Sequence, residues 1–178
     1  MKEVRVALAT TVLVLGVFAA SPAALARRTV KNPTPAQIQT AVRRAEHSKS
    51  LWATVNICDT RRYPKTFGVR GQMPALGFAS WLTMVVRVDY YSTTKKRFLP
   101  AGATMRVRLG RLSFGLQQDG ATFGPFKRHA GLLDASIQFL WKRSGKLLGQ
   151  ATRGTTAGHP DADFGSPPHF SASQCRIR

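Results

Sequence analysis

Acidic residues are scarce in this chain of 178 residues. It holds 8 Asp and Glu against 27 Lys and Arg, a formal net charge of +19 at pH 7. Such an excess attracts polyanions over long range, and the resulting binding is non-specific and weakens with salt. Anionic polymers of a cell envelope and other acidic surfaces are the expected partners, and no specific nucleic acid is predicted. The alternative is that the basicity is only compositional, because net charge bears on solubility more than on a specific function.

Catalytic signatures are absent as well. The chain has no Gly-x-Ser-x-Gly, no His-Glu-x-x-His and no phosphate-binding loop. Glutamate occurs only at positions 3 and 46, so a glycosidase-type carboxylate pair would have to use aspartates. The aspartates are Asp59, Asp89, Asp119, Asp134, Asp161 and Asp163. These absences favour a protein that is not an enzyme and needs no cofactor.

Cysteine is limited to Cys58 and Cys175, and no Cys-x-x-Cys motif is present. In a secreted chain an even pair indicates one disulfide. Closing a loop of about 117 residues would stabilise the fold by about 4 to 5 kcal/mol in the chain-entropy model. The alternative, a redox-active or nucleophilic thiol, lacks a supporting motif.

Long hydrophobic runs are absent after residue 26. Before it, Lys2 and Arg5 precede an apolar run from Val6 to Ala20, and small residues stand at Ala24 and Ala26. This layout is typical of a secretory signal peptide over residues 1–26, cleaved after Ala26, and predicts a secreted or envelope-associated protein. Cleavage leaves 25 basic and 7 acidic residues, a net charge of +18. An uncleaved membrane anchor is the alternative, since 21 uncharged residues could span a bilayer.

Residues 27–48 are expected to form a basic arm and a short amphipathic helix. Thr34 can cap the helix, Pro35 suits its first position, and Gln37 can complete a capping box. Apolar residues then recur at helical spacing up to about His47. The apolar stripe is thin, so the sequence predicts a helix that docks loosely.

Residues 49–178 alternate with the period of two that is typical of strands. We expect strands at 51–58, 66–73, 80–91, 97–99, 105–109, 121–126, 133–141, 146–155 and 170–177. Short strands separated by turn residues indicate an all-β, immunoglobulin-like antiparallel sandwich, with a small barrel as the alternative. Trp81 and Trp141 are expected in the core or at its corners.

Four segments resemble a family of small secreted bacterial β-sandwich proteins without an assigned activity. They are LWATVNICDT at 51–60, GVRGQMP at 68–74, ATRGTTAGH at 151–159 and CRI at 175–177. The resemblance covers about residues 35–178. It implies the sandwich and the disulfide, and it supplies no catalytic residues.

A basic and aromatic surface is the main candidate for binding. Arg106 and Arg108, together with Arg87, alternate outward on predicted strands, and Trp52, Trp81 or Tyr91 could join them. The polyanion-contact candidates are Arg87, Lys95, Lys96, Arg97, Arg106 and Arg108. The alternative is an ordinary solvated sheet face whose aromatic residues lie in the core.

The loop at 158–169 carries the densest set of metal-ligand types. Its weak candidates are His159, Asp161, Asp163 and His169. Their spacing matches neither an EF-hand nor a paired-histidine site, and three prolines indicate a plain loop. We therefore predict no metal.

The composition and motifs together favour a secreted, non-catalytic module that associates with anionic envelope polymers. Two alternatives stay open, namely a secreted hydrolase using the 159–169 loop and a cationic protein that acts on membranes.

Overall fold

The computed structural model describes residues 30–127 and 131–178. The expected signal peptide, residues 1–26, lies outside these ranges. Over the described ranges the chain is mostly β-strand with a single α-helix. No helix there is both long and apolar enough to cross a membrane.

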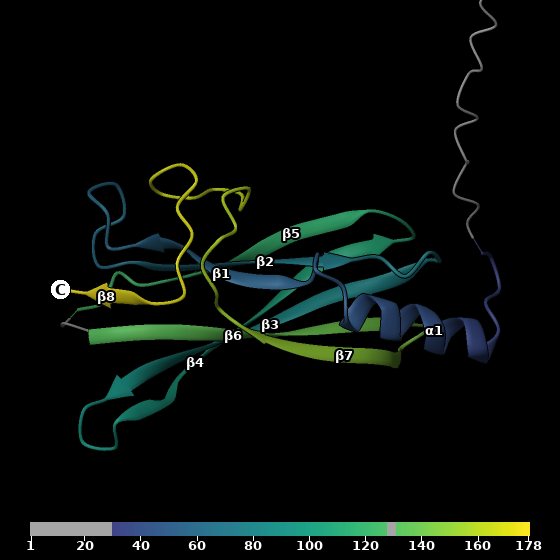
Figure 1. Cartoon of the computed structure of the whole chain (residues 1–178), viewed down its shortest axis with the longest axis horizontal. Helices are drawn as coiled ribbons and strands as arrows, with labels where there is room; N and C mark the ends of the chain where they lie inside the picture. The colour runs from purple at the N-terminus through teal and green to yellow at the C-terminus, as the bar shows by residue number, and fades with distance from the viewer. Residues whose placement is uncertain (1–29, 128–130) are drawn as a thin grey trace, which may run out of the picture.

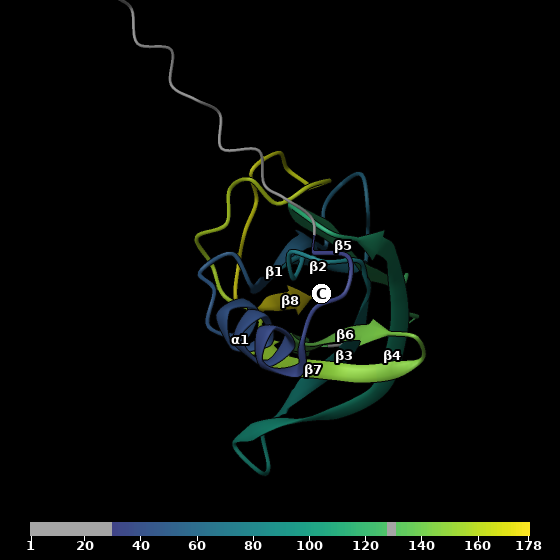
Figure 2. The same ribbon diagram turned by 90° about the vertical axis from the view of Figure 1, so that its right-hand side faces the viewer.

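Eight antiparallel strands form two sheets. The strands are β1 (Trp52–Cys58), β2 (Phe67–Pro74), β3 (Ser80–Ser92), β4 (Arg97–Leu112), β5 (Leu116–Phe123), β6 (Gly131–Arg143), β7 (Lys146–Gly154) and β8 (Cys175–Ile177). Sheet A has the order β1-β2-β5, and sheet B has the order β4-β3-β6-β7, with β8 also pairing β6. The two sheets stack as layers in Figures 1 and 2.

This arrangement confirms the immunoglobulin-like sandwich. In immunoglobulin lettering, β1, β2 and β5 take the places of strands A, B and E, and β3, β6 and β7 those of C, F and G. The remaining long strand, β4, pairs with β3 at the edge of sheet B. Figure 2, which looks along the sandwich, shows β4 curving around one side of the molecule toward β5.

The core lies between the sheets, where alternate residues of each strand point inward. Met84, Val86, Ile137 and Phe139 are fully buried and come from the two central strands of sheet B. Trp141 is also fully buried, and its indole N–H donates to the carbonyl of Pro74 at 2.8 Å. The prediction that Trp141 packs in the core is therefore confirmed.

Helix α1 (Pro35–Glu46) has the predicted capping box. The Gln37 backbone N–H donates to the Thr34 hydroxyl, and the Thr34 N–H donates to the Gln37 side chain. The helix packs against the sandwich more firmly than its thin stripe suggested, since Val42 and Ala45 are buried. Gly149 on β7 permits this packing, because a Cβ atom there would lie 2.2 Å from a methyl group of Val42.

Three strand predictions need correction. The separate strands at 97–99 and 105–109 are one strand, β4, whose pairing with β3 shifts around Val88 and lets Pro100 and Gly102 fit on an edge. The strand expected at 121–126 begins earlier, at Leu116. The last strand starts at Cys175 rather than at residue 170, and residues 170–174 hold one isolated bridge, at Ala172.

The predicted disulfide is present between Cys58 and Cys175, whose Cα atoms are 5.4 Å apart. Cys58 ends β1 in sheet A, and Cys175 begins β8 beside β6 in sheet B. The bridge therefore ties the two layers together. Nearby, the Asp59 carboxylate accepts backbone N–H groups from Arg178 and Lys65, and these bonds lower its pKa.

A long segment, residues 156–174, crosses the outer face of sheet A, and we call it the strap. It is the yellow loop region above β1 in Figure 1. The Thr54 hydroxyl lies 2.7 Å from that of Ser171, and the Asn56 amide donates to the backbone carbonyls of Asp163 and Phe164. The strap explains why β1 is buried on both faces, although its sequence alternates.

Candidate polyanion-binding face

The outer face of sheet B gathers the arginines that the sequence singled out. In the β3–β4 register, Arg106 lies opposite Val85, Arg108 opposite Thr83, and Thr104 opposite Arg87. Residues opposite each other in a sheet project from the same face. All three arginines are exposed. The structure therefore places Arg87, Arg106 and Arg108 on one surface.

Trp81 extends this surface at its far end. It pairs with Arg111 on β4 and with Lys142 on β6, so a cationic residue stands on each side of the indole. Its side chain is 53% exposed. Trp81 was offered both a place in the core or at a corner and a place beside the arginines, and it takes the second because it shares the outward phase of Thr83 and Arg87. We call the set Trp81, Arg87, Arg106, Arg108 and Arg111 the arginine face.

The floor of the arginine face is apolar. Val85 and Leu140 are each only 6% exposed, although both project outward and no further layer of the sandwich covers them. Long neighbouring side chains must shield them, since arginine stems cover apolar surface while their charged heads stay in water.

Within the described part of the chain, the cations of the arginine face have no carboxylate partners closer than 4.0 Å. Across the described residues, the one ion pair closer than 4.0 Å joins Arg70 and Asp119 at 3.3 Å, and both of these belong to sheet A. The guanidinium groups of the arginine face are thus available to an external anion. Arginine suits phosphate and carboxylate oxygens because its planar fork can donate two parallel hydrogen bonds.

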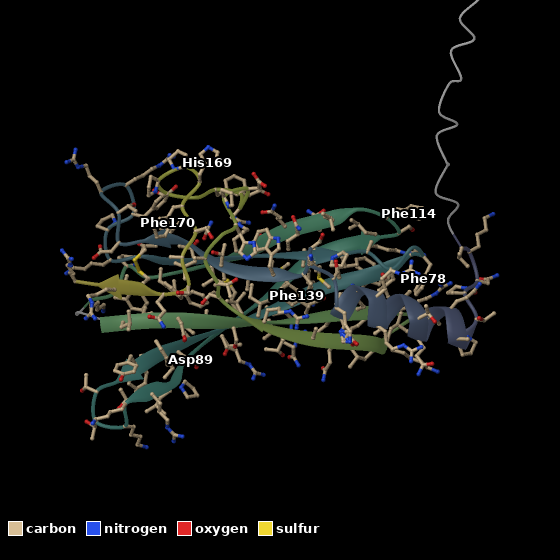
Figure 3. All side chains as sticks on the ribbon, viewed as in Figure 1. Phe78, Asp89, Phe114, Phe139, His169 and Phe170 are labelled. Atoms are coloured by element: carbon tan, nitrogen blue, oxygen red, sulfur yellow. A yellow bond between two sulfur atoms is a disulfide. The ribbon has the colours of Figure 1, made fainter. Side chains whose placement is uncertain are left out.

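Two carboxylates interrupt the positive surface near the C-terminal end of β3, away from Trp81. Asp89 lies opposite Asp134 in the β3–β6 register, and Figure 3 labels Asp89 beside the projecting β3–β4 hairpin. Burial, and next the charge of Asp89, raise the pKa of Asp134 to about 6. The sequence did not predict this pair. Its two residues are 45 positions apart, and the residues of neither strand alone determine the register in which the two strands align.

The other predicted cations lie away from the arginine face. Lys95, Lys96 and Arg97 sit at the tip of the β3–β4 hairpin, which projects beyond the sandwich in Figure 1. Behind the tip, Tyr91 and Phe98 meet edge to face with ring centroids 5.3 Å apart. The six predicted contact residues therefore form two separate groups.

Trp52, proposed as a partner of the arginines, belongs to the opposite sheet. Its ring stacks on His159 of the strap, with centroids 4.5 Å apart and an interplanar angle of 14°. His159 Nε2 also lies 3.0 Å from the Thr156 hydroxyl, and burial lowers the pKa of this histidine. Both rings fasten the strap, and neither joins the arginine face.

The weak metal candidates do not converge. His159 is engaged with Trp52, and His169 Nδ1 lies 3.1 Å from the carbonyl of Pro160. Asp161 and Asp163 are exposed, and their backbone groups bond to the side chain of Gln118. In the ranges 30–127 and 131–178, no three His, Cys, Asp or Glu residues are placed to hold a metal ion.

A hollow of about 670 Å³ lies at the end of the sandwich that α1 covers, between α1 and the turns that follow β2 and β4. Figure 3 labels Phe78 and Phe114, two of its lining residues, at this end. The lining is largely apolar and contains no carboxylate, with Gln37 and Arg44 among its few polar side chains. The hollow therefore offers no acid–base pair for hydrolysis.

Comparison with known proteins gives little to set beside this geometry. No protein-family model matches the sequence, and a search of the curated proteins finds no match. Among solved structures, the chain is similar to a glycosyl hydrolase family 2 member from Bacteroides cellulosilyticus DSM 14838, with 8% identity and a TM-score of 0.35. The match covers 63% of this chain and 15% of the length of that protein. A likeness this distant identifies no family for the chain.

Proposed function

We propose that this protein is a secreted, non-catalytic β-sandwich module that binds anionic polymers of the cell envelope through its arginine face. The observation that carries the proposal is the grouping of Arg87, Arg106 and Arg108 with Trp81 on one exposed face, where none of them has an ion-pair partner among the described residues. The resemblance to small secreted bacterial β-sandwich proteins remains part of this proposal.

The spacing of the cations supports an extended, repeating ligand. Arg106 and Arg108 are two residues apart on one strand, a separation of about 7 Å. Arg87 lies diagonally across from Arg106 on the adjacent strand, about 7–8 Å away. A polymer with regularly spaced charged groups can contact several such cations at once, whereas a small anion would contact one. Trp81 adds an exposed ring on which a sugar or another flat group can stack.

The disulfide supports the location. A bridge between Cys58 and Cys175 persists in an oxidising compartment and is rare in the cytosol. Together with the predicted signal peptide, the disulfide supports a location outside the cytoplasm, where anionic wall polymers are abundant partners for a basic protein.

A double variant tests the proposal. R106Q/R108Q removes two cations from the arginine face, and R43Q/R44Q removes two exposed cations from α1 as a control of equal charge. With poly(glycerol phosphate) as the probe at low salt, we expect the face variant to bind roughly tenfold more weakly than the control. Binding of the wild-type protein should be lost near 1 M NaCl, where the Debye length is about 3 Å.

Equal weakening in the two variants would mean that net charge alone drives binding, and the arginine face would then have no special role. Binding that is unchanged between low salt and 1 M NaCl would reject the electrostatic mechanism altogether. Leakage of dye from acidic vesicles at micromolar protein would instead support the membrane-active alternative.

A further inference from the structure

The Asp89–Asp134 pair is anomalous for this protein. The two residues lie directly opposite each other on neighbouring strands, with 27 Lys and Arg in the chain, yet neither has an ion-pair partner among the described residues. Like charges placed directly across two strands destabilise a sheet. Both side chains are partly buried, which weakens the screening of their repulsion by water.

The charged neighbours of the pair are few. On the outer face of sheet B, Arg87 precedes Asp89 by two residues on β3, and Arg176 of β8 lies opposite Leu132 on β6. The residues of β4 opposite this part of β3 are Pro100 and Thr104, which are uncharged. At the end of β7 the residue on this face is Gly154, opposite Ser136, whereas the Thr156 backbone N–H donates to the Ala53 carbonyl of sheet A.

Neither Arg87 nor Arg176 offsets the repulsion at Asp134. The pKa of Asp134 is raised to about 6 by burial and by Asp89, and among the described residues no cation stands as a cause that lowers it. One carboxylate of the pair therefore takes up a proton in mildly acidic solution, where an ordinary aspartate stays ionised.

The pair also lies in the path of a bound polymer. Along β3 the outward residues run from Trp81 through Arg87 to Asp89, and the hairpin tip with Lys95 and Lys96 follows. A polymer that extends from the arginine face toward the cationic tip must pass the two carboxylates, whose negative charge repels it.

We propose that the Asp89–Asp134 pair makes the arginine face an acid-strengthened binding site, holding anionic polymers more tightly as the solution becomes mildly acidic. This inference rests on the proposed function of that face. Protonation removes a repulsive charge from the polymer's path, and by linkage a bound polymer favours the protonated pair to the same extent.

The test compares three proteins at pH 5 and pH 7.5 with labelled poly(glycerol phosphate), measured by fluorescence anisotropy at fixed ionic strength. D134N removes the titrating group, and D161N removes an exposed carboxylate from the strap over the opposite sheet as the matched control. Comparing variants at each pH cancels any contribution from the histidines, which are the same in all three proteins.

At pH 7.5 we expect D134N to bind about threefold more tightly than the wild type, the effect of removing one charge about 7 Å from a polymer charge in a water-like dielectric. At pH 5 the two proteins should bind alike. D161N should differ from the wild type by the same factor at both pH values.

If D134N and the wild type differ by the same factor at both pH values, the pair does not regulate binding and the inference is overturned. A D161N profile that matches that of D134N would overturn it as well. If none of the proteins binds the polymer at low salt at either pH, the proposed function itself fails, so the two failures are distinguishable.

Discussion

At the scale of single residues, Asp134 makes folding stability depend on pH in a definite direction. Its pKa is about 6 in the folded protein against 3.8 as the ordinary value. The folded state therefore binds more protons than the unfolded state between these values, so stability falls as the pH rises through this window. The loss of stability caused by ionised Asp134 is absent below about pH 4 and complete above about pH 6.

D134N should therefore stabilise the protein at pH 7 by about 1 kcal/mol, a figure reduced for the partial exposure of the side chain. At pH 4 the variant and the wild type should unfold alike. Urea unfolding at the two pH values measures both differences. A variant that is less stable at pH 7 would show that the Asp134 carboxylate makes favourable contacts instead.

The sequence predicts residue positions well where a strand alternates and poorly where two strands must be aligned. Arg87, Arg106 and Arg108 were expected to point outward because of their phase, and they do. Trp81 has the same phase, and although its size also allowed a place in the core, its phase places it on the outer surface. The Asp89–Asp134 pair depends on the β3–β6 register, which requires the fold.

At the scale of elements, the strap is attached to β1 by a buried amide. Asn56 is 2% exposed and donates to the carbonyls of Asp163 and Phe164, while the Ser166 and Ala172 N–H groups donate to carbonyls of β1. Asn56→Ala removes these two side-chain bonds, at a cost of about 1–3 kcal/mol.

Hydrogen exchange measures this effect locally. In N56A the amides of residues 157–172 should exchange faster, while those of β3 and β6 serve as an internal reference within the same sample. Unchanged exchange in the strap would show that the Trp52–His159 stack and the Thr54–Ser171 contact hold the strap without Asn56.

The contact between α1 and β7 depends on one glycine. A methyl group at Gly149 would lie 2.2 Å from Val42, whereas one at Gly154 on the same strand would meet nothing within 4 Å. Overpacking of this kind costs about 1–3 kcal/mol. We expect G149A to lower the melting temperature and G154A to leave it nearly unchanged. Equal melting of the two variants would mean that the helix contributes little to stability.

Elements were predictable where a local pattern was strong. The helix, with its capping box, and the long strands β3 and β6 have clear periodicity, and each lies close to its predicted bounds. The double burial of β1 was not predictable, because the strap that covers it lies about 100 residues away and has no periodicity of its own. Polar residues at 117–119 likewise hid the first half of β5.

At the scale of the whole molecule, the Cys58–Cys175 bridge holds the layers together across 117 residues of sequence. The C58S/C175S variant should lose about 4–5 kcal/mol of stability, since an unfolded chain without the bridge gains conformational freedom. Urea unfolding of the variant and of reduced wild-type protein should agree. A variant as stable as the oxidised wild type would show that packing alone joins β8 to the sandwich.

The sandwich architecture followed from the alternating strands, but the division of eight strands between two sheets did not. Assigning β4 to sheet B rather than to sheet A decides which residues stand beside Trp81 and Arg87. Strand composition does not encode that choice, so the arginine face could be suspected from the sequence but not assembled from it.

For the proposed polymer-binding function, the strap has a consequence for how many copies of this protein could assemble on one polymer. Because it covers the outer face of sheet A, the molecule has one open, cationic broad side and one closed side on which Asp161 and Asp163 are exposed. Such a one-sided shape favours several copies coating a single polymer chain, with their closed sides turned to solvent. It disfavours cross-linking of neighbouring polymer chains into a network.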